Sequence, residues 1–344
     1  MIEKKLLVSA IEPSANLHLK EVLNELKNYE IIGVFDKALG NPIVDSNKFN
    51  VMGFLDVIPK IKLAKRTINK LVDLSKDVDK VLLIDAPSFN LPLAKAIKNK
   101  YPDKEIIYYI LPKVWAWKRG RIKVVNRYVD KKAYIFPFEE KIWEDGIYLG
   151  NPILDEINQF RDDKLYGNVA FLPGSRKSEI KNLMPIFKGL EKEIKKNRLL
   201  VVPEIYKNRI KEIYGDVREF DIIFSTKEAL LKSDFAYICS GTATLEAAII
   251  GTPFVLMYKT RWIEYLIARS LVKLNYVGLA NIIFENEGLE PFHKEYLQTF
   301  DKKELLNDFK NSSLKEFKEK SFKLRKILKF GSKKNLVKLI KGEL

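Results

Sequence analysis

Two short loops rich in glycine and small polar residues carry the side chains best suited to chemistry. One comprises Gly174, Ser175 and Arg176 and follows the apolar run 168–172. The other comprises Ser240, Gly241 and Thr242, follows the apolar run 235–239 and leads to Glu246. Each pattern predicts a buried strand, a glycine turn and the start of a helix. The unpaired N–H groups and positive dipole end of such a helix favour a phosphate group.

Arg176 and Glu246 extend this interpretation from a phosphate to a nucleotide. The planar guanidinium of Arg176 suits a diphosphate, because it can bind two oxygens at once. A carboxylate as close to a phosphate as Glu246 needs another partner, such as the hydroxyls of a ribose. The alternatives are a solvated arginine at a turn and a first-turn acid that complements the helix dipole.

The first half of the chain supplies candidates for a catalytic base and for apolar ligand contacts. Asp85 closes the apolar run 80–84, and Glu12 follows the first apolar run, just before Pro13. Either carboxylate could accept a proton from a reacting hydroxyl, or could simply cap a helix. Four further residues could contact an acyl chain or a ligand ring, or belong to the core: Met52, Phe54, Trp115 and Trp117.

Composition narrows the class of protein. The chain has 344 residues, 47% of them hydrophobic, which suffices for two domains. The two histidines and the single cysteine, Cys239, offer little for a zinc site or a disulfide, so we expect no metal and no cofactor. No apolar run is long enough for a signal peptide core or a membrane span. We therefore expect a cytoplasmic protein that lies peripherally on a membrane.

The net charge of +16 needs a partner. Nucleic acid and an anionic membrane surface are the two usual partners of a strongly basic protein. The positive charge is concentrated in residues 59–70 and 318–341, where lysine alternates with apolar residues as in basic amphipathic helices. Solvated helix faces are the alternative explanation.

Apolar runs alternate with helical patterns along most of the chain, which predicts parallel sheets covered by helices on both faces. We expect two doubly wound, Rossmann-like α/β domains that face each other across a cleft. The expected segments are residues 1–160 as an acceptor domain, 161–310 as a nucleotide domain and 311–344 as a basic helical tail.

Taken together, these segments resemble the lipid-A-disaccharide synthase family. The matching segments are 52–57, 84–90, 114–117, 172–176, 240–248, 251–253 and 271–281. The resemblance implies a GT-B fold whose C-terminal helices return to the first domain. It also implies transfer of 2,3-diacylglucosamine from its UDP derivative to 2,3-diacylglucosamine 1-phosphate (lipid X). The linkage formed is β(1→6), with inversion and without metal.

The resemblance also implies roles for individual residues. Asp85 matches the general base, Arg176 the arginine at the UDP diphosphate, and Glu246 the residue that holds the ribose. Glu12 and Asn281 match further functional positions. The family implies no nucleic-acid partner, peripheral association with the cytoplasmic face of the inner membrane, and a homodimer with swapped C-terminal helices.

The chain departs from the usual family pattern at several positions. These are Ile11, Ala15, Asn16, Ser88, which stands where an aspartate is common, and Asn151, which stands where a histidine is common. The loss of glycine near Glu12 restricts the backbone there. Two other functions stay open at this point: another UDP-sugar enzyme of the GT-B type, and a basic RNA-binding protein.

Overall fold

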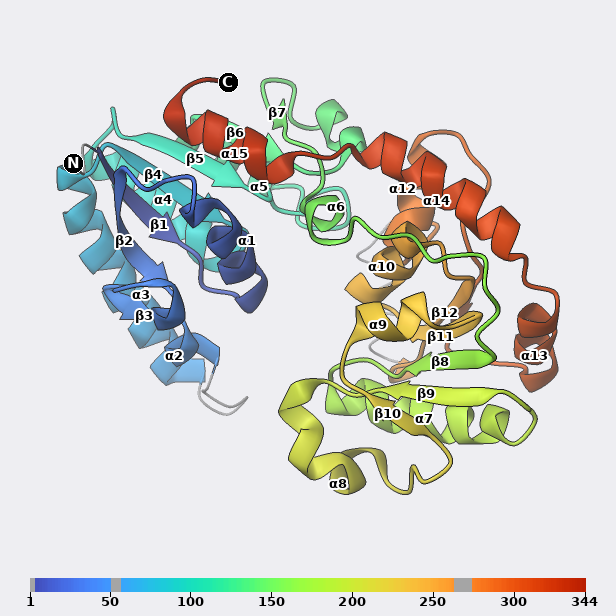
Figure 1. Ribbon diagram of the computed structural model, residues 1–344. Coiled ribbons are helices and arrows are strands. Elements are labelled where there is room, and N and C mark those ends of the chain that lie inside the picture. Colours follow the sequence, from blue (N-terminus) through green and yellow to red (C-terminus); the bar gives the residue numbers. More distant parts are fainter. Residues whose placement is uncertain (1–3, 51–56, 263–273) are drawn as a thin grey trace. The chain divides into compact units, whose positions relative to one another are not determined.

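The computed structural model describes residues 4–50, 57–262 and 274–344. The chain folds into two compact units (Figure 1). Unit 1 comprises Met1–Asp155 together with Leu328–Leu344, and unit 2 comprises Glu156–Ile327. Each unit has its own sheet, and in each sheet the paired strands run parallel.

The sheet of unit 1 has the strand order β3-β2-β1-β4-β5-β6-β7. Its strands are β1 (Lys4–Ser9), β2 (Tyr29–Phe35), β3 (Val44–Asp45), β4 (Lys80–Ile84), β5 (Glu105–Tyr109), β6 (Lys131–Tyr134) and β7 (Ile147–Tyr148). The central strands are buried on both faces, as their continuous apolar runs predict.

Helices cover both faces of this sheet. They are α1 (Pro13–Leu23), α2 (Asn47–Asn50), α3 (Val57–Leu74), α4 (Pro87–Lys100), α5 (Arg121–Tyr128), α6 (Pro152–Glu156) and α15 (Ser332–Lys341), with short 3₁₀ turns η1 (Lys37–Leu39), η2 (Ser75–Asp77) and η3 (Pro137–Lys141). Helices α3, α4 and α5 pack side by side on one face, and α1 and α15 pack together on the other.

The sheet of unit 2 has the strand order β10-β9-β8-β11-β12-β13. Its strands are β8 (Asn168–Leu172), β9 (Asn197–Val201), β10 (Asp221–Ile223), β11 (Phe235–Cys239), β12 (Phe254–Tyr258) and β13 (Glu295–Leu297). The helices are α7 (Lys177–Glu191), α8 (Ile210–Tyr214), α9 (Thr226–Leu231), α10 (Thr242–Ile250), α12 (Leu279–Asn286), α13 (Lys302–Lys310) and α14 (Leu314–Leu328), with the 3₁₀ turn η4 (Glu204–Arg209). Helices α7 and α13 are neighbours, as are α9, α10 and α12.

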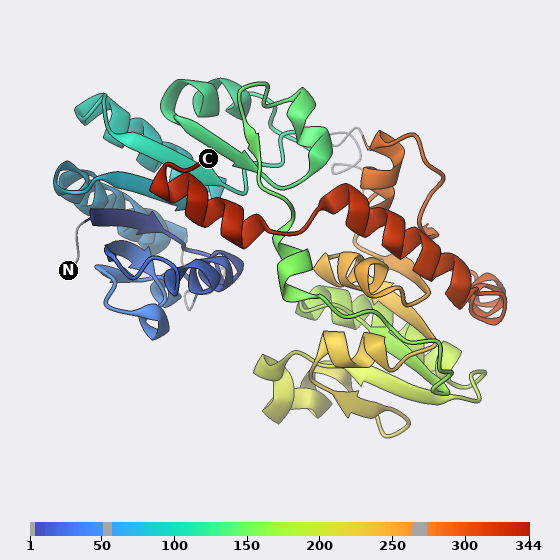
Figure 2. The same ribbon diagram turned by 45° about the horizontal axis from the view of Figure 1, so that its top comes forward.

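The C-terminal tail is divided between the two units. In unit 2, the Ser321 hydroxyl and the Arg325 guanidinium of α14 both donate to the Ile249 carbonyl of α10. In unit 1, α15 buries its apolar face, and its Ser332 hydroxyl lies 2.8 Å from the hydroxyl of Tyr109. The tail forms two separate helices (Figure 2), and the intervening Gly331 has a φ of +95°, outside the right-handed helical region.

Two helices of unit 1 begin at a proline. Helix α4 begins at Pro87 and helix α1 at Pro13, because proline suits the first turn of a helix. Within the described residues, we find no helix with the length and apolarity needed to cross a membrane.

Candidate active site

In unit 1, three charged residues follow adjacent strands. Glu12 comes after β1, Asp85 directly after β4 and Lys113 after β5. Strand β4 pairs with β1 on one side and with β5 on the other. The strands are parallel, so the three residues follow their carboxyl ends along one edge of the sheet. Open α/β sheets bind ligands at this edge.

Asp85 sits in a strained turn. Asp85 and Ala86 have φ values of +48° and +45°, in the left-handed region that residues other than glycine seldom adopt. The Asn90 amide donates to the Asp85 carbonyl at 2.7 Å, and the Tyr108 hydroxyl donates to the same carbonyl, also at 2.7 Å. The Ser9 hydroxyl in turn donates to Asn90. These contacts hold a conformation that costs energy, and such strain concentrates at functional sites.

The surroundings of Asp85 set its basicity. Burial raises the pKa of the Asp85 carboxyl, while the charge of Lys113 and a hydrogen bond from the Ala86 N–H lower it. The pKa of Glu12 is also raised, first by burial and then by the charge of Asp85, and Lys113 again lowers it. The two carboxylates and the lysine therefore interact. Sequence reasoning assigned no role to Lys113, because nothing in its local pattern indicates two carboxylates from other loops.

Trp115 is fixed by a buried carboxylate that sequence reasoning also missed. Its indole N–H donates to Oε1 of Glu139 at 3.2 Å, and its ring packs edge-on against Phe136 and Phe138. Glu139 also accepts the N–H groups of Ile135 and Phe136. Burial nevertheless raises the pKa of Glu139 to about 7.

We expect the fluorescence of Trp115 to follow the protonation of Glu139. Above pH 7 the indole donates to a carboxylate, and below pH 7 to a neutral acid that holds it less strongly. The difference spectrum between the protein and its Trp115→Phe variant should therefore change with a midpoint near pH 7. Glu139→Gln should remove this transition. A transition that persists in Glu139→Gln would assign it to another group.

The other residues predicted to contact the acceptor are Trp117, Met52 and Phe54. The Trp117 side chain is 45% exposed. The Lys118 ammonium lies 4.4 Å and the Arg121 guanidinium carbon 5.6 Å from the centre of its ring system. Met52 and Phe54 lie outside the described residues. The sequence prediction for these two residues therefore stays a prediction.

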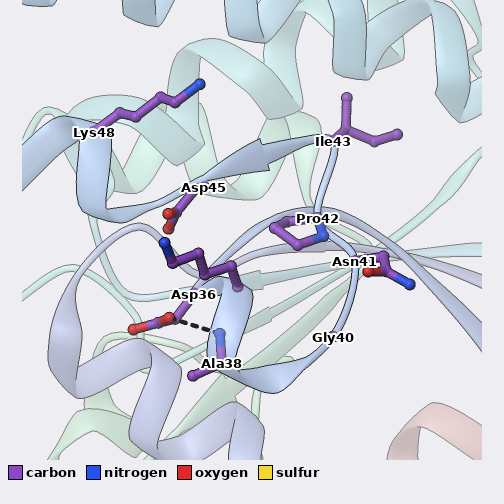
Figure 3. Close-up of a pocket in the computed structure, with 9 residues that line it drawn as sticks. Asp36, Ala38, Gly40, Asn41, Pro42, Ile43, Asp45 and Lys48 are labelled. Carbon is purple, nitrogen blue, oxygen red and sulfur yellow. Dashed lines mark hydrogen bonds between the residues drawn. The ribbon is translucent and has the colours of Figure 1, made fainter.

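A shallow depression of about 640 Å³ lies in unit 1, in the segment that follows β2 (Figure 3). It is lined by Asp36, Lys37, Ala38, Gly40, Asn41, Pro42, Ile43, Asp45 and Lys48. The carboxylate of Asp36 turns back to accept the N–H of Ala38 at 2.9 Å. Its charged residues are of both signs, so we assign it no ligand.

In unit 2, the loop 173–176 is held by a buried glutamate. Gly174 has a φ of +95°, and a Cβ there would come within 2.4 Å of Oε2 of Glu179. Glu179 accepts the Arg176 N–H through Oε2 and the Arg176 guanidinium through Oε1, at 3.2 and 2.8 Å. The Arg176 side chain is 78% exposed and that of Glu179 only 9%. Glu179 thus anchors one side of the guanidinium and leaves the rest free. Its position three residues after Arg176, typical of a capping box, is the signal that could have revealed it.

The second loop lies beside the first. Strand β8 pairs with β11, and Leu172 is in register with Ile238, so the loops that follow them share one sheet edge. Gly241 is exposed, and a Cβ there would meet nothing within 4 Å, so its backbone is open to a ligand. Ser240 is partly buried, and Thr242 is exposed at the start of α10.

Glu246 lies one turn into α10 and is largely buried. Burial alone raises the pKa of its carboxyl, and among the described residues we find no cation or hydrogen-bond donor paired with it. A buried carboxylate of this kind is costly when ionised, unless a ligand supplies donors. Two ribose hydroxyls would do so.

Asn281, predicted as a functional residue, is held by hydrogen bonds within unit 2. Its side chain is fully buried. The amide nitrogen donates to Glu295 and to the His293 carbonyl, and its oxygen accepts the N–H groups of Phe292 and His293. Glu295 also accepts the N–H of Gly278, just before α12. Asn281 therefore ties the start of α12 to the segment before β13.

The unusual residues of the chain have structural partners. The buried Asn16 amide donates to the carbonyls of Ala10 and Glu12 and to Ser46, and so fixes the loop of Glu12. Asn151 donates to the Ile135 carbonyl and accepts the Ile153 N–H. Three others differ in exposure: Ile11 and Ala15 are buried and Ser88 is exposed. In residues 4–50, 57–262 and 274–344, no three or more His, Cys, Asp or Glu side chains are grouped to hold a metal ion.

Comparison with known proteins decides the family. The model of the lipid-A-disaccharide synthetase family matches residues 6–339. The chain belongs to this family. It is 45% identical to a lipid-A-disaccharide synthase of Campylobacter jejuni strain RM1221, over 98% of this chain and 99% of that protein. It is 46% identical to one of Helicobacter pylori strain P12, over 81% of this chain and 79% of that protein.

Solved structures agree on the fold. MurG of Acinetobacter baumannii superimposes with a TM-score of 0.61 at 14% identity, over 99% of this chain and 100% of that one. The UDP-GlcNAc 2-epimerase of Neisseria meningitidis gives 0.56 at 13% identity, over 98% of each chain. The predicted fold class is confirmed: two parallel-sheet α/β domains of the GT-B type with a helical C-terminal end. Family membership also decides against the RNA-binding alternative.

Proposed function

We propose that the protein transfers 2,3-diacylglucosamine from UDP-2,3-diacylglucosamine to the 6-hydroxyl of 2,3-diacylglucosamine 1-phosphate, in lipid A biosynthesis. The observation that carries this proposal is membership of the lipid-A-disaccharide synthetase family, whose model matches residues 6–339. The strained turn at Asp85, held by Asn90 and Tyr108, supports Asp85 as the base of that reaction.

In the proposed mechanism, Asp85 accepts the proton of the acceptor 6-hydroxyl. At the same time, the oxygen of that hydroxyl attacks the anomeric carbon of the donor. The bond from that carbon to the diphosphate oxygen breaks, and UDP leaves with the electron pair. Attack opposite the leaving group inverts the anomeric carbon and gives a β(1→6) linkage.

Unit 2 supplies the proposed donor contacts. Arg176 stabilises the departing diphosphate through the part of its guanidinium that Glu179 leaves free. Gly174, Ser175, Ser240, Gly241 and Thr242 offer backbone and hydroxyl donors to the phosphates. Glu246 accepts hydrogen bonds from the ribose. We assign Asn281 a positioning role at the start of α12, because its amide is already hydrogen-bonded to Glu295 and to the N–H of Phe292.

The stereochemistry of the product tests this mechanism. The disaccharide formed by the purified protein should have a β anomeric configuration at a carbon linked to O6, measured by proton coupling constants and carbon shifts. An α linkage would exclude a single displacement with Asp85 as the base. A linkage to another hydroxyl would change the acceptor assignment.

Lys113 should tune the pH dependence of the reaction. Asp85 is active as a base only when ionised, and the Lys113 charge lowers its pKa. Lys113→Met should therefore raise that pKa and move the acidic limb of the kcat profile to higher pH, with little change at alkaline pH. Lys123→Met, at an exposed lysine of α5, should leave the limb in place. An unmoved limb in Lys113→Met would show that Asp85 does not control it.

We propose that the protein lies on the cytoplasmic face of the inner membrane and docks through α3. Ile61 is 61% exposed there, beside the exposed Lys62, Lys65 and Arg66. Basic residues near an anionic surface contribute about 1 kcal/mol each, and an exposed apolar side chain adds to this. A homodimer that exchanges the C-terminal helices stays a prediction, as does the functional role of Glu12.

Replacing Lys62, Lys65 and Arg66 of α3 with glutamate should weaken binding to vesicles that contain phosphatidylglycerol, on the order of 100-fold or more at low salt. The matched control reverses Lys323, Lys326 and Lys334, three exposed lysines of α14 and α15, and should bind nearly as the unmodified protein does. Loss of binding in the control alone would move the docking surface to the C-terminal helices.

A further inference from the structure

A group of cations beside Asp85 has no part in the mechanism above. Arg121 is the first residue of α5, and its Nη2 lies 3.5 Å from the hydroxyl of Ser88, in the first turn of α4. The Lys118 ammonium and the Arg121 guanidinium both lie against the ring of Trp117, at 4.4 and 5.6 Å. A hydroxyl, two cations and an indole ring thus come together from the starts of α4 and α5 and the loop between β5 and α5.

These groups lie close to the proposed base. Ser88 is three residues after Asp85, on the helix that the strained turn begins. Tyr108 donates to the Asp85 carbonyl. Burial raises the pKa of the Tyr108 hydroxyl and the charge of Arg121 opposes that rise, so Arg121 is near the same turn.

Arg121 is available for a ligand. Among the described residues its hydrogen bond is the long one to Ser88, and we find no carboxylate within ion-pair distance. The start of α4 has no side-chain cap. Pro87 has no N–H and the Phe89 N–H donates to the Ala86 carbonyl, so among the described residues the Ser88 N–H is the first-turn donor without a partner. The Arg121 guanidinium, the Ser88 hydroxyl and the Ser88 N–H together match the oxygens of a phosphate monoester.

We propose that Arg121 and Ser88, with Lys118 beside Trp117, form the subsite for the phosphate of the acceptor. The inference rests on the proposed function. In the acceptor sugar, the carbons that carry the 6-hydroxymethyl group and the phosphate are both bonded to the ring oxygen. When the 6-hydroxyl is at Asp85, the phosphate must therefore lie about one sugar ring away. Trp117 offers an apolar surface against which a sugar face can pack.

A comparison of two acceptors tests the subsite: 2,3-diacylglucosamine 1-phosphate and the same sugar without phosphate, in detergent micelles. Arg121→Met should lower kcat/KM for the phosphorylated acceptor about 10- to 100-fold, as expected for a lost hydrogen bond to a charged group. Turnover of the sugar without phosphate and the Kd for UDP should stay unchanged. Arg121→Lys should recover part of the loss, and Lys123→Met on the same helix should behave as the unmodified protein.

An equal loss on both acceptors would overturn the subsite, because it would mean that Arg121 acts through the fold. Unchanged selectivity would overturn it as well. If the unmodified protein makes no disaccharide from either acceptor, the proposed function fails instead. In that case the subsite is tested by the Kd for the phosphorylated acceptor, measured in detergent micelles. Equal affinity in Arg121→Met and unmodified protein would exclude it, and an affinity weakened 10-fold or more would support it.

Discussion

Asp85→Asn is expected to lower kcat about 10²- to 10⁴-fold, the range of general base catalysis, while the Kd for UDP stays within about twofold. The asparagine amide cannot accept the proton of the acceptor hydroxyl. The substitution suits the backbone, because asparagine tolerates the left-handed conformation that Asp85 adopts at φ +48°. The rate of disaccharide formation measures the loss of kcat. Calorimetry measures the Kd for UDP separately.

The matched control is Asp103→Asn. Asp103 is an exposed carboxylate between α4 and β5, away from the carboxyl ends of the strands, and its substitution should leave turnover unchanged. Nearly full activity in Asp85→Asn would remove Asp85 from the chemistry. Loss of UDP binding together with activity would mean that the strained turn supports the fold rather than the reaction.

Arg176→Ala is expected to weaken UDP binding about 10- to 100-fold and to lower kcat at saturating donor as well. A guanidinium hydrogen bond to a phosphate contributes about 1.5–3 kcal/mol. The same contact strengthens when charge develops on the departing diphosphate, so the rate falls further than the affinity alone requires. Titration with UDP and saturation kinetics in donor separate these two effects.

Two control variants make the Arg176 result specific. Lys177→Met removes a neighbouring exposed charge and should change little. Glu179→Gln replaces one of the two oxygens that hold Arg176, so it should give a smaller loss of the same kind. A rate unchanged in Arg176→Ala would exclude it from the site. Equal losses in Lys177→Met would mean that overall charge, and not the guanidinium, attracts the donor.

Much of the fold could be predicted from the sequence, because apolar runs and glycine turns are local signals. The runs 80–84, 168–172 and 235–239 each became a strand of the predicted length. The parallel pairing also follows from the alternation with helices. The division of the tail could not be predicted, since α14 and α15 have similar compositions. Their separation depends on partners distant in sequence, Ile249 for one helix and Tyr109 for the other.

Candidate site residues could be proposed from the sequence only where a single loop carries its own signal. Asp85, Arg176 and Glu246 follow strands and could be named as candidates from the pattern alone. Lys113, Glu139 and Arg121 could not, because their relevance comes from groups on other loops. Asn281 stays a predicted functional position, and its fully buried amide is engaged by the protein itself, which its local sequence does not indicate.

In the proposed reaction, this chain joins two diacylglucosamine units with release of UDP. The most direct measurement incubates the purified protein with UDP-2,3-diacylglucosamine and 2,3-diacylglucosamine 1-phosphate, and follows UDP and disaccharide 1-phosphate by mass spectrometry. We expect one disaccharide for each UDP released, and neither product when either substrate is omitted. UDP released without disaccharide, at a rate independent of the acceptor, would contradict the proposed reaction.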